Sequence, residues 1–84
     1  MTLVIADQAP SDAQVTDYDR AHLTLYLRLL DADREQAAWD EVASILLAVD
    51  PVKERDRARL RYETHLARAH WMSDGGYLDL LRSS

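Results

Sequence analysis

The sequence predicts a small all-α domain of three main helices plus a short C-terminal helix. Three segments place apolar residues at helical spacing, and the breaks between them contain aspartate, proline or glycine. The chain has 84 residues, 48% of them hydrophobic, and no cysteine, so neither disulfides nor cysteine-bound metals stabilise it. A chain of this length has room for one core. We therefore expect one compact helical domain.

Residues 1–16 are expected to form a flexible N-terminal arm, and residues 17–84 a single domain. After a short apolar stretch at 3–5 the arm shows no helical period, and it contains Pro10 and Ser11. Terminal segments of this kind are poorly ordered unless something holds them.

The first helix is expected to begin after Thr16 or Asp17, because either side chain can accept a hydrogen bond from the free backbone N–H groups at a helix start. It continues to about Leu30. Asp31 and Asp33 are expected to form the break that follows, and Asp33 is placed to cap the next helix.

The second helix is expected over about residues 34–48, followed by a connection over 49–54. Proline disfavours helical geometry in the residue before it, so Asp50-Pro51 marks the stop. The connection is longer than the turn of an ordinary helix-turn-helix, but the order of elements is compatible with that motif. The apolar residues of the segment form one helical stripe: Trp39, Val42, Ala43, Leu46 and Val49.

The third helix is expected to start within 52–59 and to end at about residue 72 or 73. Gly75-Gly76 follow, and glycine readily adopts the positive φ that ends many helices. A short last helix over 77–82 is expected to close the chain.

Charge is unevenly distributed along the chain. The 10 Lys and Arg and 15 Asp and Glu give a net charge of −5, which opposes unaided binding to DNA or to an anionic membrane. Residues 1–50 hold three basic and ten acidic side chains (−7), whereas 51–84 hold seven and five (+2). On the third helix, five side chains share a sector about 100° wide: Arg57, Arg61, Thr64, His65 and Arg68.

This sector has two interpretations. A basic stripe on the last long helix of a three-helix domain is typical of a recognition helix that enters the major groove of DNA. Alternatively, the arginines solvate an exposed face or serve as internal partners for acids of the second helix and its flanks. Those acids are Asp31, Asp33, Glu35, Asp40, Glu41 and Asp50.

The first helix is apolar on two faces. One stripe comprises Leu23, Tyr26, Leu27 and Leu30, and a second comprises His22, Leu25 and Leu29. A helix apolar on two sides is buried on two sides. Either the arm or the C-terminal helix covers the second stripe, or it binds a protein partner. The residues selected for such a docking face are His22, Leu25 and Leu29, with Trp71 and Tyr77 as aromatic anchors.

No pattern typical of catalysis or metal binding is found. His65 and His70 are five residues apart and do not form the i, i+4 pair of a metal site. The two glycines are adjacent, so there is no glycine-rich phosphate loop, and the serines lack a nucleophile signature. We expect no enzyme activity, metal or cofactor. No apolar run approaches the roughly 20 residues of a membrane span, so a cytoplasmic protein is expected.

Three segments resemble the RovC-like DNA-binding-domain family. They are AHLTLYLRLLDAD, WDEVASILLAVDP and RARLRYETHLARAHWMSDGGYLDLLR, and the resemblance covers about residues 17–82. HLARAHWM and GGYLDLLR are its most specific strings. The resemblance implies an extended-turn variant of the helix-turn-helix, which agrees with the long connection over 49–54.

The resemblance also implies a function in transcription. Some members are the DNA-binding part of transcriptional activators on mobile elements, joined to an N-terminal partner domain. This chain has a 16-residue arm in that place and a negative net charge, and so is similar to free-standing acidic antiactivators of conjugative-element transfer. Such a protein binds the N-terminal domain of a transcriptional activator of the same family. A LuxR-type quorum-sensing regulator of the TraR kind is implied as a second partner.

We therefore expect an antiactivator that represses transcription, and thus gene transfer, by sequestering activators. The alternative is a small sequence-specific DNA-binding regulator that uses Arg57, Arg61, Thr64, His65 and Arg68. An acidic chain has unfavourable electrostatics for DNA, so this alternative calls for a dimer or a partner.

Overall fold

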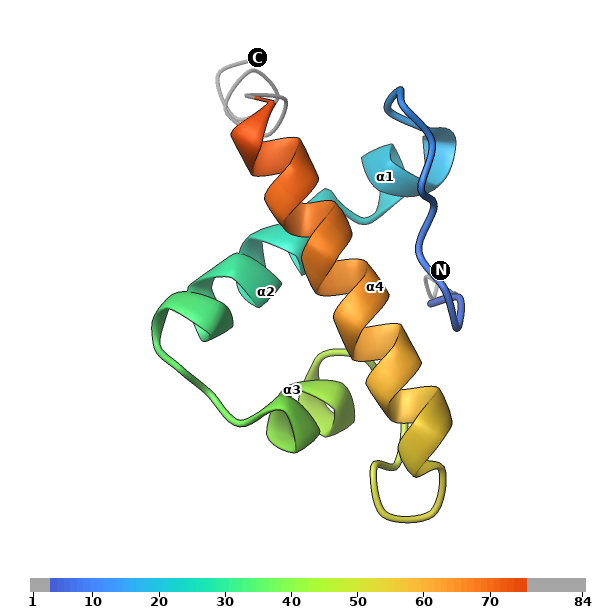
Figure 1. The fold of residues 1–84 in the computed structure, drawn as a ribbon, viewed down its shortest axis with the longest axis vertical. Helices are drawn as coiled ribbons and strands as arrows, with labels where there is room; N and C mark the ends of the chain where they lie inside the picture. Colours follow the sequence, from blue (N-terminus) through green and yellow to red (C-terminus); the bar gives the residue numbers. More distant parts are fainter. Residues whose placement is uncertain (1–3, 76–84) are drawn as a thin grey trace.

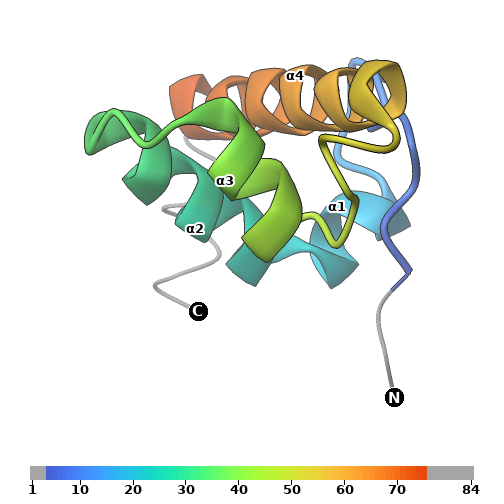
Figure 2. The same ribbon diagram turned by 90° about the horizontal axis from the view of Figure 1, so that it is seen from below.

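One long helix lies across three shorter ones. The computed structural model describes residues 4–75. Its helices are α1 (Asp17–Ala21), α2 (Leu23–Arg34), α3 (Trp39–Ile45) and α4 (Arg55–Asp74). α4 packs against α2 and α3, and the residues before α1 run along its other flank (Figures 1 and 2). The predicted all-α fold is confirmed, while the last helix expected over 77–82 lies outside the described residues.

The expected first helix is divided into α1 and α2 at His22. Thr16 caps α1 as expected, and it forms a capping box with Asp19, in which each side chain accepts a hydrogen bond from the other residue's backbone N–H. The His22 ring lies 2.7 Å from the Tyr18 carbonyl oxygen through Nδ1. A side chain that enters the backbone hydrogen-bond ladder in this way bends a helix.

The break expected at Asp31 and Asp33 is wrong, because both residues lie within α2. The helix ends instead in a Schellman turn: the Ala37 N–H donates to the Ala32 carbonyl at 2.9 Å, and Gln36 has a φ of 60°. The expected cap by Asp33 is therefore also wrong, since α3 starts after Ala38 without a side-chain cap.

α3 is shorter than the helix expected over 34–48. Ala48 has a φ of 53°, so the chain leaves the helical course before Pro51 is reached. Asp50 starts the turn into α4, because its Oδ1 accepts hydrogen bonds from the two N–H groups that follow Pro51, at 2.9 and 3.1 Å. The connection between the two helices therefore spans 46–54 rather than 49–54.

α4 agrees with the expected third helix at both ends. It begins within the predicted 52–59 and ends beside Gly75, whose N–H donates to the Trp71 carbonyl at 3.0 Å. The expected positive φ at Gly75 is wrong, because its φ is −80°. Gly76 lies outside the described residues.

The core lies where α4 crosses α2 and α3. The stripe predicted for the second helix is confirmed, with Val42, Ala43 and Val49 buried and Trp39 and Leu46 packed against them. α2 buries Tyr26 and Leu29, one residue from each of the two predicted stripes. The side of α2 that faces the core therefore lies between the two stripes. Among residues 4–75, no helix is long and apolar enough to cross a membrane.

Candidate functional site

The N-terminal segment, residues 4–16, lies along the polar flank of α4. This flank carries the predicted basic sector, Arg57, Arg61, Thr64, His65 and Arg68. Its Ala9 is buried, and the Ala9 N–H donates to the Thr64 hydroxyl at 3.1 Å. Further along, the carbonyls of Asp12 and Gln14 accept hydrogen bonds from Arg68 at 2.6 and 2.9 Å. The segment expected as a flexible arm thus has defined contacts with α4 in this structure, while its flexibility stays a prediction.

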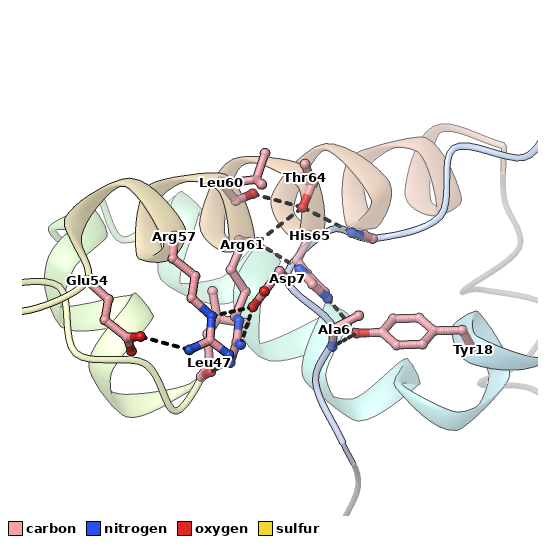
Figure 3. A network of polar contacts seen from close by, with 11 residues as sticks. Ala6, Asp7, Tyr18, Leu47, Glu54, Arg57, Leu60, Arg61, Thr64 and His65 are labelled. Carbon is pink, nitrogen blue, oxygen red and sulfur yellow. Dashed lines mark hydrogen bonds and ion pairs between the residues drawn. The ribbon is translucent and has the colours of Figure 1, made fainter.

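Asp7 joins two arginines of α4 (Figure 3). Its Oδ1 lies 2.6 Å from Arg57 Nε and 2.6 Å from Arg61 Nη2. Arg57 also pairs with Glu54 at 2.9 Å, and the buried Arg61 donates to the Leu47 carbonyl at 2.7 Å. Hydrogen bonds from Arg61 and then Arg57 lower the pKa of the Asp7 carboxyl. The two guanidinium groups are therefore held by an ionised carboxylate of the same chain.

His65 is fully buried between α4 and α1 (Figure 3). Its Nδ1 lies 2.7 Å from the Arg61 carbonyl oxygen, which can only accept, so Nδ1 carries the proton. Its Nε2 then accepts from the Tyr18 hydroxyl at 2.6 Å, and this hydroxyl accepts from the Ala6 N–H at 3.0 Å. Burial lowers the pKa of His65 and raises that of Tyr18, so both stay neutral near pH 7.

Replacing Tyr18 with phenylalanine is expected to lower the free energy of unfolding by about 1–2 kcal/mol, because it leaves His65 Nε2 and the Ala6 N–H without their partner. Urea denaturation measures the loss, and hydrogen exchange at the Ala6 amide is expected to speed up. Tyr62→Phe is the matched control, since no hydrogen bond of the Tyr62 hydroxyl is found within residues 4–75. Equal stability of the two variants would show that the hydrogen bonds of the Tyr18 hydroxyl to His65 and Ala6 do not stabilise the fold.

Arg68 and Asp19 form an ion pair inside the protein. Their side chains are 3% and 0% exposed, and Arg68 reaches Asp19 through Nε at 3.0 Å and Nη2 at 2.7 Å. Asp19 also accepts hydrogen bonds from the Tyr26 hydroxyl and the Thr16 N–H, each at 2.8 Å. Burial alone would raise the pKa of Asp19, but the bonds from Arg68, Thr16 and Tyr26 outweigh it and lower the pKa to about 2.

The five residues of the predicted basic sector are thus brought together, but three of them face inward. Arg61, His65 and Arg68 are buried, whereas Arg57 and Thr64 stay nearer the surface. Ion pairs of Arg57, Arg61 and Arg68 support the interpretation of these arginines as partners of carboxylates in the same chain. The expected carboxylates were wrong, because the arginines of this sector pair with Asp7, Asp19 and Glu54.

The middle of the exposed side of α4 is acidic, and exposed arginines flank it at the start of the helix. Exposed residues spaced three or four apart form a stripe that we call the outer face of α4: Asp56, Leu60, Glu63, Ala67, His70 and Asp74. It contains three carboxylates and neither lysine nor arginine. Beside it, the guanidinium groups of Arg55 and Arg59 lie 5.3 and 4.9 Å from the centre of the Trp39 ring, and Arg59 also pairs with Glu63 at 2.5 Å.

The residues selected for a docking face do not form one surface. His22 and Leu29 are buried, and Leu25 is half-buried. Trp71 lies on another flank, with the Arg68 guanidinium 3.9 Å from its ring centre. Tyr77 lies outside the described residues.

Leu25 and His22 line a groove with apolar residues that the sequence did not place beside them. Those residues are Ile5, Ile45 and Leu46. Asp7, Tyr18 and Asp19 were missed as well. Of these, only Asp19 had a signal in the sequence, because it stands three residues after Thr16, the spacing of a capping box. Within the part of the chain that the structure describes, no group of His, Asp and Glu side chains is arranged to hold a metal ion.

A family model described as "T6SS, Transcription factor, DNA binding domain" matches residues 2–82. The match covers the N-terminal segment as well as the helices. No curated protein sequence matches the chain significantly.

Proposed function

This chain belongs to the RovC family of transcription-factor DNA-binding domains, and we propose that it regulates transcription by binding an activator protein instead of DNA. In this proposal it is an antiactivator. It binds the N-terminal domain of an activator from the same family and prevents that activator from reaching its promoter. A bound competitor removes the activator by mass action, so comparable affinity and sufficient concentration are enough.

The observation that carries this proposal is the charge on the outer face of α4. A recognition helix turns its exposed face to the base edges and to the phosphates on either side. Here that face presents Asp56, Glu63 and Asp74. The exposed Arg59 beside it is paired with Glu63, and Arg61 and Arg68 are buried and paired with Asp7 and Asp19 of the same chain. Carboxylates placed against phosphates oppose docking, and the net charge of −5 adds to this effect.

The test is a binding titration with the separately expressed N-terminal domain of a same-family activator. We expect saturable binding with a dissociation constant of about 1 μM or below. We also expect this chain to displace the activator's own DNA-binding domain from that complex. Absence of binding under conditions where the activator's own domain binds would contradict the proposal. A LuxR-type quorum-sensing regulator is the second partner to test in the same assay.

Sequence-specific DNA binding is the second candidate, and the family match favours it. The start of α4 carries Arg55, Arg57 and Arg59, all exposed, at the helix end that contacts bases in many helix-turn-helix proteins. Fluorescence titration of the chain with promoter DNA at low salt separates the two candidates. Binding that prefers one sequence and weakens steeply with salt would favour this candidate over the antiactivator.

A further inference from the structure

An apolar groove lies between α2, the end of α3 and the N-terminal segment. It encloses about 320 Å³ and is lined by Ile5, His22, Thr24, Leu25, Arg28, Ile45 and Leu46. Ile45 is 76% exposed, although it is one of the larger apolar side chains of the domain. Leu25 and Leu46 are half-buried in the wall. The groove therefore presents apolar surface that the described part of the chain leaves uncovered.

Arg28 gives this groove a charge. It is exposed, and within residues 4–75 it has neither a carboxylate partner nor an aromatic ring beside its guanidinium. The other exposed arginines of residues 4–75 have such partners. Arg20 pairs with Asp17, Arg34 with Asp31, Arg57 with Asp7 and Arg59 with Glu63, while Arg55 lies over Trp39. In a chain of net charge −5, a lone cation beside an apolar groove fits a ligand that carries a carboxylate next to apolar side chains.

We propose that this groove binds one amphipathic helix of the activator's N-terminal domain, with its apolar side chains against Leu25, Ile45 and Leu46 and an acidic side chain paired with Arg28. The inference rests on the proposed antiactivator function. We take a helix as the occupant because an amphipathic helix lays its apolar face into a hydrophobic groove, and residues 4–75 contain no strand whose edge an extended segment could join. The apolar contacts supply affinity, and the ion pair selects partners with an acid at that position.

Ile45→Asp tests the apolar half of the proposal. Because Ile45 is 76% exposed, the variant is expected to fold like wild type, which circular dichroism and thermal unfolding check. We expect its affinity for the activator's N-terminal domain to be at least about tenfold weaker. Val52→Asp is the matched control, since Val52 is 87% exposed and does not line the groove, and it is expected to bind like wild type.

Arg28→Glu tests the charge. We expect binding about tenfold weaker, with a smaller salt dependence, whereas Arg34→Glu on the same helix is expected to bind like wild type. Reversing the charge of the matching acid on the activator is expected to restore the affinity for Arg28→Glu.

The outcomes separate the two proposals. If wild type binds the activator domain and Ile45→Asp and Arg28→Glu bind equally well, the groove proposal is wrong and the antiactivator function stands. If wild type itself does not bind, the function is wrong and the groove proposal falls with it. Self-association of the wild type that is lost in Ile45→Asp would identify a second copy of the chain as the occupant and overturn the proposal.

Discussion

Replacing Arg68 with methionine is expected to lower the free energy of unfolding by about 3–5 kcal/mol. The substitution leaves Asp19, which is fully buried, without its charged partner, and it leaves the carbonyls of Asp12 and Gln14 without donors. Methionine keeps much of the packing volume, so the loss reports mainly on the charge. Small domains are stable by about 5–15 kcal/mol, so urea denaturation should show a much lower midpoint.

Two further variants show whether the burial of the pair causes this loss. Arg20→Met removes an arginine whose pair with Asp17 lies on the surface, and it is expected to cost less than about 1 kcal/mol. Adding Asp19→Asn to Arg68→Met is expected to recover part of the loss, because it removes the unpaired charge. A loss at Arg68→Met as small as that at Arg20→Met would show that Asp19 is not buried as described.

The centres of the helices were predictable from the sequence, but their ends were not. α2 ends at Arg34, and the turn that follows needs a positive φ at Gln36. Glycine is the usual residue at such a position, so the residue type does not mark the turn. Asp31 and Asp33 indicated a break because aspartate favours caps and turns. In the structure they instead pair across the surface, Asp31 with Arg34 and Asp33 with His70.

The candidate site shows a different limit of sequence reasoning. Helical spacing correctly placed Arg61, His65 and Arg68 on one side of α4, yet it predicted nothing about their burial. Polar side chains face inward only when the rest of the fold supplies partners, and those partners come from residues far away in the sequence. Asp7 is 54 positions from Arg61, and Asp19 is 49 from Arg68. Such pairs leave no local pattern.

The same contacts connect the family to the proposed function. A family model for DNA-binding domains matches the chain, and the arginines on the polar flank of α4 fit that description in sequence. In the folded chain, Asp7 forms ion pairs with Arg57 and Arg61, and Asp19 forms one with Arg68. These carboxylates occupy the guanidinium groups that would otherwise bind phosphates. The fold of the family is therefore compatible with weak affinity for DNA. The carboxylates of Asp7 and Asp19 would have to be displaced from these arginines before a phosphate could bind them.

Lowering the pH is expected to destabilise the protein in two separate ranges. The pKa of Asp19 is about 2 in the folded protein and about 3.8 when exposed, so its contribution is complete above about pH 4 and is lost as the pH falls to 2. That contribution is about 2 kcal/mol. Burial lowers the pKa of His65 below its usual 6.5, so stability also falls below about pH 6.5, where the unfolded chain takes up the proton first.

Unfolding free energies from urea titrations between pH 2 and pH 8 measure both ranges. Asp19→Asn is expected to be less stable than wild type at pH 7 but to lose less between pH 4 and pH 2, because the group that titrates is gone. Protonation of His65 would place a second proton on Nε2, which faces a Tyr18 hydroxyl already bonded to the Ala6 N–H. The contact of the N-terminal segment at Ala6 should therefore loosen on acidification, and exchange at the Ala6 amide should rise below pH 6.5 before global unfolding. If that exchange followed global unfolding at every pH, the titration of His65 would not control the contact at Ala6.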